Sequence, residues 1–208
     1  MIILLALSDG ENLVEKLLRS AEDSRPDGAL SVSVCQETSI QREYDNKAKA
    51  YPTGHRYKVD NVFIRNDVDI VSLLKPAFTT LPTRQSLSLW SSMRPRSDRP
   101  LTGMALSMQS DHYLAVYTIW ENEADDAQCG SWLSSVMGQL EPESVGSYLG
   151  EYDFQARPSK CWGSEEYQKL VEIKRKWDPD NRICGCLGLE NSGTANTSNG
   201  HASRATVR

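Results

Sequence analysis

Two tyrosines in one predicted strand lie where their phenols could orient a ligand or move a proton. The stretch YLAVYTIW, residues 113–120, alternates as a β-strand does, so Tyr113, Ala115 and Tyr117 share one face. A phenol on a sheet face that meets a ligand can hydrogen-bond it or take part in proton transfer. The pair can equally be packing residues with hydrogen-bonded hydroxyls. Both interpretations stay open, and Tyr113 and Tyr117 are candidate substrate-binding residues.

Other combinations of reactive residue types are weaker. Ser110, Asp111 and His112 are the residue types of a nucleophilic triad, but neighbours on a strand point to opposite faces and cannot converge. The three histidines are widely spaced, so we expect no metal site. The five cysteines form no C-x-x-C pair, and we expect free thiols.

Composition excludes two large classes of protein. A net charge of -5 argues against phosphate-backbone binding, so we expect no nucleic-acid partner. The apolar opening MIILLAL lacks a basic flank, and no stretch approaches the roughly 18 apolar residues of a membrane span. We therefore expect a cytoplasmic protein with no membrane partner.

The first part of the chain predicts alternating strands and helices. Residues 1–7 are expected as a strand, 11–23 as a helix capped by Asp9, and 29–36 as a second strand. Residues 38–54 are polar and end in a turn. A strand over 55–64 and a helix over 67–78, capped by Asn66 and Asp67, come next.

The second part of the chain predicts two antiparallel strands at 85–93 and 113–120, a helix from 122 to 140, and a short strand at 146–150. A last helix, 165–176, is stopped by Pro179. The sum is an α+β fold: a largely antiparallel sheet of about five to seven strands with helices on one face. Residues 188–208 have almost no apolar side chains and are expected to be a disordered tail.

The stretch CWGSEEYQKLVEIKRKWDPDNRI, residues 161–183, resembles the C-terminal segment of the berberine bridge enzyme-like family of FAD-linked oxidoreductases. The Trp162-Gly163 pair and the WDPDN stop at 177–181 match that segment in order and spacing. The stretches NDVDIVSLLKPAF and ALSMQSDHYLAVYTIWENEADDAQC are similar to the fungal branch of the family. The resemblance covers residues 1–187.

This resemblance implies a two-domain enzyme that binds FAD between a flavin-binding domain and an α+β substrate domain, and that passes a hydride from a secondary-metabolite substrate to the flavin. Residues 1–187 correspond to the substrate-binding domain, with the berberine-like segment at about 145–187. The family's glycine-rich pyrophosphate loop has no counterpart in this sequence. A flavin-dependent reaction would therefore need a partner chain that supplies the flavin domain.

The resemblance also implies roles for single residues. The family's Tyr-x-Asn near the flavin corresponds to Tyr148-Leu149-Gly150, which makes Tyr148 a candidate catalytic and cofactor-binding residue and Trp162 a second cofactor-binding residue. The position where many members carry Glu or Gln above the flavin falls at Ala115. Because Ala115 cannot act as a base, Tyr117 or Tyr113 on the same face would substitute, and Tyr117 is a candidate catalytic residue.

Three functions remain open from the sequence. The first is an FAD-linked oxidoreductase-like protein that lacks the FAD-binding domain. The second is a stand-alone metabolite-binding domain that assists a non-redox biosynthetic step. The third is an inactive truncated fragment.

Overall fold

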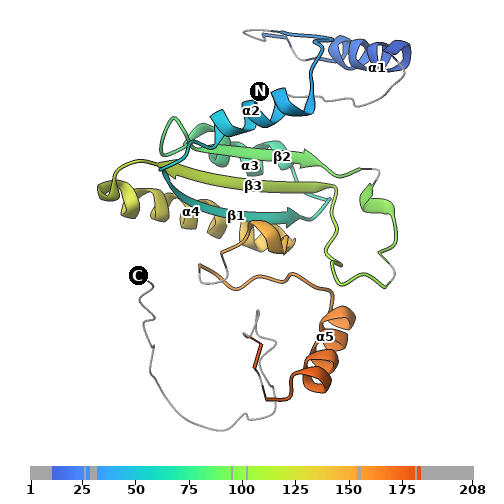
Figure 1. Ribbon diagram of the computed structural model, residues 1–208, viewed down its shortest axis with the longest axis vertical. Coiled ribbons are helices and arrows are strands. Elements are labelled where there is room, and N and C mark those ends of the chain that lie inside the picture. Colours follow the sequence, from blue (N-terminus) through green and yellow to red (C-terminus); the bar gives the residue numbers. More distant parts are fainter. Residues whose placement is uncertain are drawn as a thin grey trace. The chain divides into compact units, whose positions relative to one another are not determined.

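The computed structural model describes residues 11–25, 27–28, 32–94, 96–101, 103–153, 156–180 and 182–183 (Figure 1). The chain divides into two compact units, Met1–Thr53 and Gly54–Arg208. The strand predicted at 1–7, the Asp9 cap and the tail predicted at 188–208 lie outside the described residues. Whether residues 1–187 act as one substrate-binding domain stays a prediction.

The first unit contains two described helices, α1 (Glu11–Asp23) and α2 (Ile40–Ala50). Helix α1 confirms the prediction from apolar spacing. Helix α2 was not predicted, because it buries no residue and so shows no apolar periodicity. Its start is fixed by Ser39, whose hydroxyl accepts a hydrogen bond from the Arg42 amide at 3.1 Å. The strand predicted at 29–36 is wrong over its described part, since residues 32–36 are not in a strand and Val32 is exposed.

The second unit is built on a four-stranded sheet over its described residues. The strands are β1 (Arg56–Ile64), β2 (Leu87–Ser92), β3 (His112–Trp120) and β4 (Ser144–Gly146), in the order β2-β3-β1-β4. Every neighbouring pair is antiparallel. Strands β1 and β3 pair along their full length, from Arg56 opposite Trp120 to Ile64 opposite His112. The antiparallel sheet is confirmed, with fewer strands than the predicted five to seven.

One face of this sheet holds the hydrophobic core. Alternation places Val62, Ile64, Leu114 and Val116 on the same face, and all four are fully buried. They pack against α4 (Asp126–Leu140) together with α3 (Ile70–Thr79), which lie along the sheet in Figure 1. Each such side chain contributes roughly 1.5–3 kcal/mol by leaving water. The predicted α+β fold with helices on one face is confirmed.

Helices α3 and α4 of the second unit begin slightly later than predicted. Helix α3 is capped by Asp69 rather than by Asn66 and Asp67, because the Asp69 carboxylate accepts hydrogen bonds from the Ser72 amide at 3.2 Å and the Ser72 hydroxyl at 2.6 Å. Helix α4 follows a short 3-10 turn at Glu123–Asp125. Helix α5 (Ser164–Trp177) is confirmed.

The short strand predicted at 146–150 is displaced. Strand β4 ends at Gly146, and Leu149–Glu151 form a 3-10 turn instead. Gly146 has φ +150°, and a Cβ there would collide with Met108 and with the backbone oxygen of Lys160. The chain therefore leaves the sheet at this glycine.

Within the described residues, no helix is both long enough and apolar enough to cross a membrane. Cys35, Cys129 and Cys161 are free thiols, while Cys184 and Cys186 lie outside the described residues. The described part of the chain holds no group of three His, Cys, Asp or Glu side chains placed to bind a metal ion.

Candidate functional site

Asn61 lies on the sheet face opposite α4 and binds the turn that follows β4. Alternation along β1 places Asn61 on the face that Val62 and Ile64 do not use, and the side chain is fully buried. Its amide nitrogen donates to the backbone oxygens of Tyr148 at 2.8 Å and Glu151 at 2.6 Å. Its amide oxygen accepts from the Tyr148 backbone nitrogen at 2.6 Å. One side chain thus fixes both ends of the 3-10 turn.

The edge of β1 beside Asn61 is covered by the chain that follows β4. Strand β4 pairs only with Phe63 and Ile64, so the preceding backbone needs other partners. The Asn61 backbone oxygen accepts hydrogen bonds from Ser147 Oγ at 2.9 Å and from Arg157 Nη2 at 2.8 Å. These contacts hold the segment after β4 against the sheet.

The 3-10 turn aims Glu151 at both candidate phenols. Tyr113 Oη donates to Glu151 Oε2 at 2.5 Å, and Tyr117 Oη donates to Glu151 Oε1. The two tyrosines thus share one carboxylate, each binding a different oxygen. Hydrogen bonds to an ionised carboxylate are stronger than those between neutral groups.

The two phenols differ from free tyrosine in their surroundings. Burial raises the pKa of Tyr113 far above its ordinary value, and the hydrogen bond to Glu151 and the negative charge of that carboxylate raise it further. Tyr113 is therefore a neutral hydrogen-bond donor at physiological pH. Glu151 can accept a proton from a phenol that has itself taken one from a ligand.

A hollow of about 390 Å³ lies beside this cluster and is lined by Ala105, Leu106, Tyr148, Leu149, Gly150, Cys161 and Trp162. Tyr148 is 40% exposed there. Its ring lies over Gly150, since a Cβ at residue 150 would be 2.8 Å from the nearest ring carbon. The hollow is therefore walled by aromatic and apolar groups.

The structure brings the predicted site residues together in two pairs. Tyr113 and Tyr117 meet at Glu151, whereas Tyr148 and Trp162 line the hollow. The turn from Tyr148 to Glu151 connects the two pairs. The catalytic, substrate-binding and cofactor-binding roles assigned to them stay predictions.

Sequence reasoning missed Asn61 and Glu151. A carboxylate does lie between the two phenols, although it comes from the turn after β4 and not from position 115. Asn61 pairs with Ala115 across the strands, and an amide amid the apolar residues of β1 was the available signal. Glu151 directly follows the Tyr148-Leu149-Gly150 stretch that corresponds to the family's Tyr-x-Asn.

Ser110, Asp111 and His112 do not form a triad. Only His112 lies within β3, so alternation along a strand is not the reason, and His112 Nδ1 is buried without a hydrogen-bond partner among the described residues. The Ser110 hydroxyl donates to Asn66 Oδ1 at 2.8 Å. The Asp111 carboxylate binds Ser97 at 2.5 Å and Arg94 at 2.7 Å. These contacts have structural roles at the start of β3.

The residues around the 3-10 turn also match a known protein family. Residues 147–182 match the family model "Berberine and berberine like". They include the turn that carries Glu151, the hollow residues Tyr148 and Trp162, and α5. The chain is similar to berberine bridge enzyme-like, FAD-linked oxidoreductases. The predicted resemblance is confirmed, and we refer to residues 147–182 as the berberine-like segment.

Two curated relatives extend the similarity beyond the berberine-like segment. The FAD-linked oxidoreductase nodO of Hypoxylon pulicicidum is 33% identical over 182 residues, which are 88% of this chain and 41% of nodO. The FAD-linked oxidoreductase ptmO of Penicillium ochrochloron is 32% identical over 187 residues, 90% of this chain and 41% of ptmO. The chain thus spans about 41% of the length of these relatives.

A solved structure shares the fold. A variant of the BBE-like 1 protein of Physcomitrella patens aligns with a TM-score of 0.50 and 16% identity, over 61% of this chain and 29% of the other.

Asp178 binds the backbone at the C-terminal end of the berberine-like segment. The backbone nitrogens of Arg182 and Ile183 donate to its carboxylate at 2.6 and 3.1 Å, and the Lys174 ammonium donates to it as well. The hydrogen bond from Lys174, followed by those from Arg182 and Ile183, lowers the pKa of Asp178 against the opposing effect of burial. Asp178 therefore caps the chain that follows α5.

Proposed function

We propose that this chain supplies the substrate-binding face of an FAD-linked oxidoreductase that oxidises a secondary metabolite bearing a hydroxyl or phenol group. The observation that carries the proposal is the Glu151 carboxylate shared by Tyr113 and Tyr117, next to the aromatic hollow of Tyr148 and Trp162. The curated relatives are named FAD-linked oxidoreductases, which supports FAD as the cofactor. The substrate and the whole reaction are part of the proposal.

The residues of the hollow fit one part of FAD. Tyr148, Trp162 and Leu106 offer aromatic and apolar surface to a flat ring system. A flavin bound there would accept a hydride from the substrate. None of the residues lining the hollow is basic, so groups elsewhere would have to bind the pyrophosphate. This favours a partner that carries a flavin-binding domain.

The chain's own residues would bind and deprotonate the substrate. A substrate hydroxyl would donate its proton to the Tyr117 oxygen while Tyr117 passes its own proton to Glu151 Oε1. Tyr113, which remains protonated, would hold the other carboxylate oxygen in place. Asn61 would position Glu151 by fixing the turn. We expect this reaction to take place in the cytoplasm.

A flavin titration tests the proposal. FAD is added to the full 208-residue chain while the visible absorbance and the flavin fluorescence are recorded. We expect saturable binding with a perturbed spectrum, and at least tenfold weaker binding in Trp162→Ala. The matched control is Trp177→Ala, because Trp177 is exposed on α5 and does not line the hollow.

Glu151→Gln tests whether the carboxylate and the hollow act independently in flavin binding. Because Glu151 does not line the hollow, this variant should bind FAD as the wild type does. No saturable binding by the folded wild-type chain, or equal binding by Trp162→Ala, would remove flavin binding by this chain from the proposal.

A further inference from the structure

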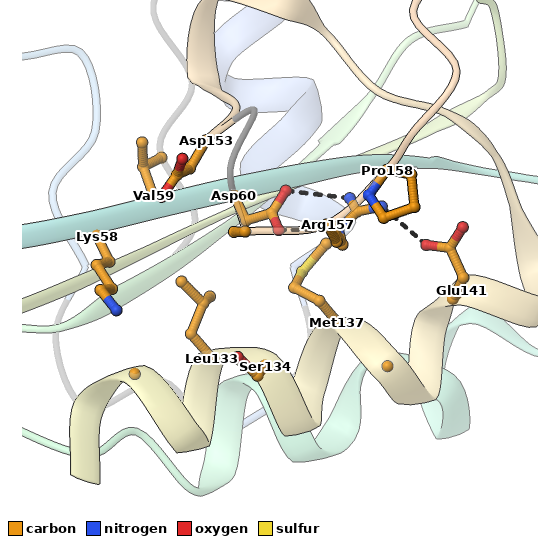
Figure 2. Close-up of a pocket in the computed structure, with 13 residues that line it drawn as sticks. Lys58, Val59, Asp60, Leu133, Ser134, Met137, Glu141, Asp153, Arg157 and Pro158 are labelled. Atoms are coloured by element: carbon orange, nitrogen blue, oxygen red, sulfur yellow. Dashed lines mark hydrogen bonds and ion pairs between the residues drawn. The ribbon is translucent and has the colours of Figure 1, made fainter. Parts of the chain in front are cut away.

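A second cavity lies on the opposite face of the sheet, between β1 and α4 (Figure 2). Its volume is about 310 Å³. Asp60 reaches it from β1, whereas the next residue, Asn61, points to the face that carries Glu151. The cavity therefore shares no side chain with the site proposed for substrate and flavin.

Small residues on α4 leave this space open. Gly130, Ser134 and Gly138 recur every four residues and so line the same side of the helix. A Cβ at Gly138 would have no atom within 4 Å. Leu133 and Met137, only 5% and 2% exposed, give the cavity an apolar wall.

The positive charge of Arg157 is already paired within the protein. Its guanidinium binds both oxygens of Asp60 at 2.9 and 3.0 Å and Glu141 at 2.8 Å. It also donates to the Asn61 backbone oxygen and to Ser147 Oγ. The Arg157 guanidinium therefore binds acceptors of the protein itself at this edge of the cavity.

Lys58 is the available cation. Figure 2 shows its side chain extending from β1 toward α4, and its ammonium would lie 3.0 Å from a Cβ at Gly130. Among the described residues, no carboxylate forms an ion pair with Lys58. Lys58 thus brings to one end of the cavity a positive charge that forms no ion pair, although it acts over a longer distance on Asp126, which does not line the cavity.

We propose that this cavity binds a small organic monocarboxylate whose body is a single ring or a short alkyl chain. Lys58 pairs with the carboxylate, and the apolar body lies against Leu133 and Met137. An apolar cavity of about 150 Å³ takes up benzene, so a ring with a short side chain suits the larger space here. Glu141 and Asp153 also border the cavity and disfavour a doubly charged phosphate.

The test uses phenylacetate as the probe and the full chain as the protein, with binding followed by calorimetry or by amide chemical shifts. We expect saturable binding by the wild type. Lys58→Met should weaken phenylacetate binding about fivefold, the upper range for an exposed ion pair. The neutral isostere phenylacetamide should bind both proteins equally, which separates lost charge from lost packing.

Gly138 provides a blocking variant and its control. Gly138→Leu extends into the open space and should abolish binding, while leucine is the better helix former, so helix α4 is not weakened. Gly138→Ala adds one methyl group in open space and should bind phenylacetate nearly as the wild type does. Far-ultraviolet circular dichroism confirms that each variant is folded.

Three results would overturn the proposal: no saturable binding of phenylacetate by the wild type, unchanged binding by the folded Gly138→Leu variant, or equal phenylacetate binding by Lys58→Met and the wild type. The flavin titration reads out the other face of the sheet, so failure here and failure of the proposed function are distinguishable.

Discussion

The side-chain amide of Asn61 donates to the backbone oxygen of Glu151 at 2.6 Å across 90 residues of sequence. The same amide also fixes Tyr148, so the turn between these two residues is held at both ends. The Glu151 carboxylate consequently reaches two phenols that belong to the sheet. A buried amide in a strand therefore positions the acid of the candidate site.

Replacement of Asn61 should destabilise the second unit and release the turn. Asn61→Ala removes three hydrogen bonds and leaves the Tyr148 and Glu151 backbone groups without this partner, so we expect a loss of about 3 kcal/mol in the free energy of unfolding. Urea denaturation followed by circular dichroism measures this loss.

The matched control for Asn61→Ala is Asn122→Ala. Asn122 precedes the 3-10 turn at Glu123–Asp125, is exposed, and makes no side-chain cap hydrogen bond. We expect its replacement to change stability by less than about 0.5 kcal/mol. Equal effects of the two substitutions would show that the Asn61 contacts contribute no special stability.

Removal of Arg157 should be among the most damaging substitutions. Asp60 is buried, and Arg157 binds both of its oxygens. Arg157→Met leaves a buried carboxylate without its partner, which costs about 3–5 kcal/mol. The midpoint of urea unfolding should fall accordingly near neutral pH.

The pH dependence of that loss follows from Asp60. Burial raises the pKa of Asp60 above its usual 3.8, and Arg157 partly offsets this rise. A carboxyl with a higher pKa in the folded state loses stability as the pH rises from the unfolded pKa through the folded one. Without Arg157 the folded pKa rises further, so Arg157→Met should be more harmful near pH 8 than near pH 4.

A double variant checks the assignment of this pH dependence. Asp60→Asn combined with Arg157→Met removes the titrating group, and the additional loss between about pH 4 and pH 8 should disappear. If the double variant keeps the pH dependence of the single Arg157→Met variant, another group is responsible for it.

The helices and strands predicted correctly from the sequence are those whose apolar residues recur at a regular spacing. Strands β1 and β3 and helices α1, α4 and α5 all show a clear apolar spacing, and all were located to within a few residues. Helix α2 lacks an apolar face, and only its cap at Ser39 marks it. Residues 32–36 alternate like a strand, yet the four-stranded sheet does not include them. Alternation alone does not guarantee a pairing partner.

The candidate site was predictable only in part, for a related reason. The shared face of Tyr113 and Tyr117 follows from local alternation. The position of Glu151 beside them does not follow from local alternation. It depends on the hydrogen bonds from Asn61 to a turn far along the chain, and on Gly146, where β4 ends. Such long-range contacts are fixed by tertiary packing, which no local period encodes.

The ionisation of Tyr113 should be suppressed in the folded protein. Burial and Glu151 both raise its pKa, so its phenol should remain protonated while ordinary tyrosines ionise near pH 10. In an alkaline titration followed at about 295 nm, Tyr113→Phe should leave the first absorbance step of the native protein unchanged. Loss of one tyrosine's amplitude from that step would contradict the assignment.

The same shift makes the folded protein sensitive to alkali. Because the folded pKa of Tyr113 exceeds the unfolded value, its contribution to stability is complete below about pH 10 and is lost as the pH rises further. Glu151→Gln removes one cause of the shift and should reduce this alkaline loss. A loss of stability above pH 10 that is the same in Tyr113→Phe as in the wild type would exclude Tyr113 as its source.

Asp178 and Asp180 should differ sharply although they stand two residues apart. The buried Asp178 carboxylate binds the amides of Arg182 and Ile183, whereas Asp180 is exposed. Asp178→Ala should speed amide hydrogen exchange at Arg182 and Ile183 about tenfold, and Asp180→Ala should leave it unchanged. Because the folded pKa of Asp178 lies below its unfolded value, this protection should hold above about pH 4 and decline as the pH falls further. Equal exchange rates in the two variants would mean that the end of the berberine-like segment is held by contacts other than those of Asp178.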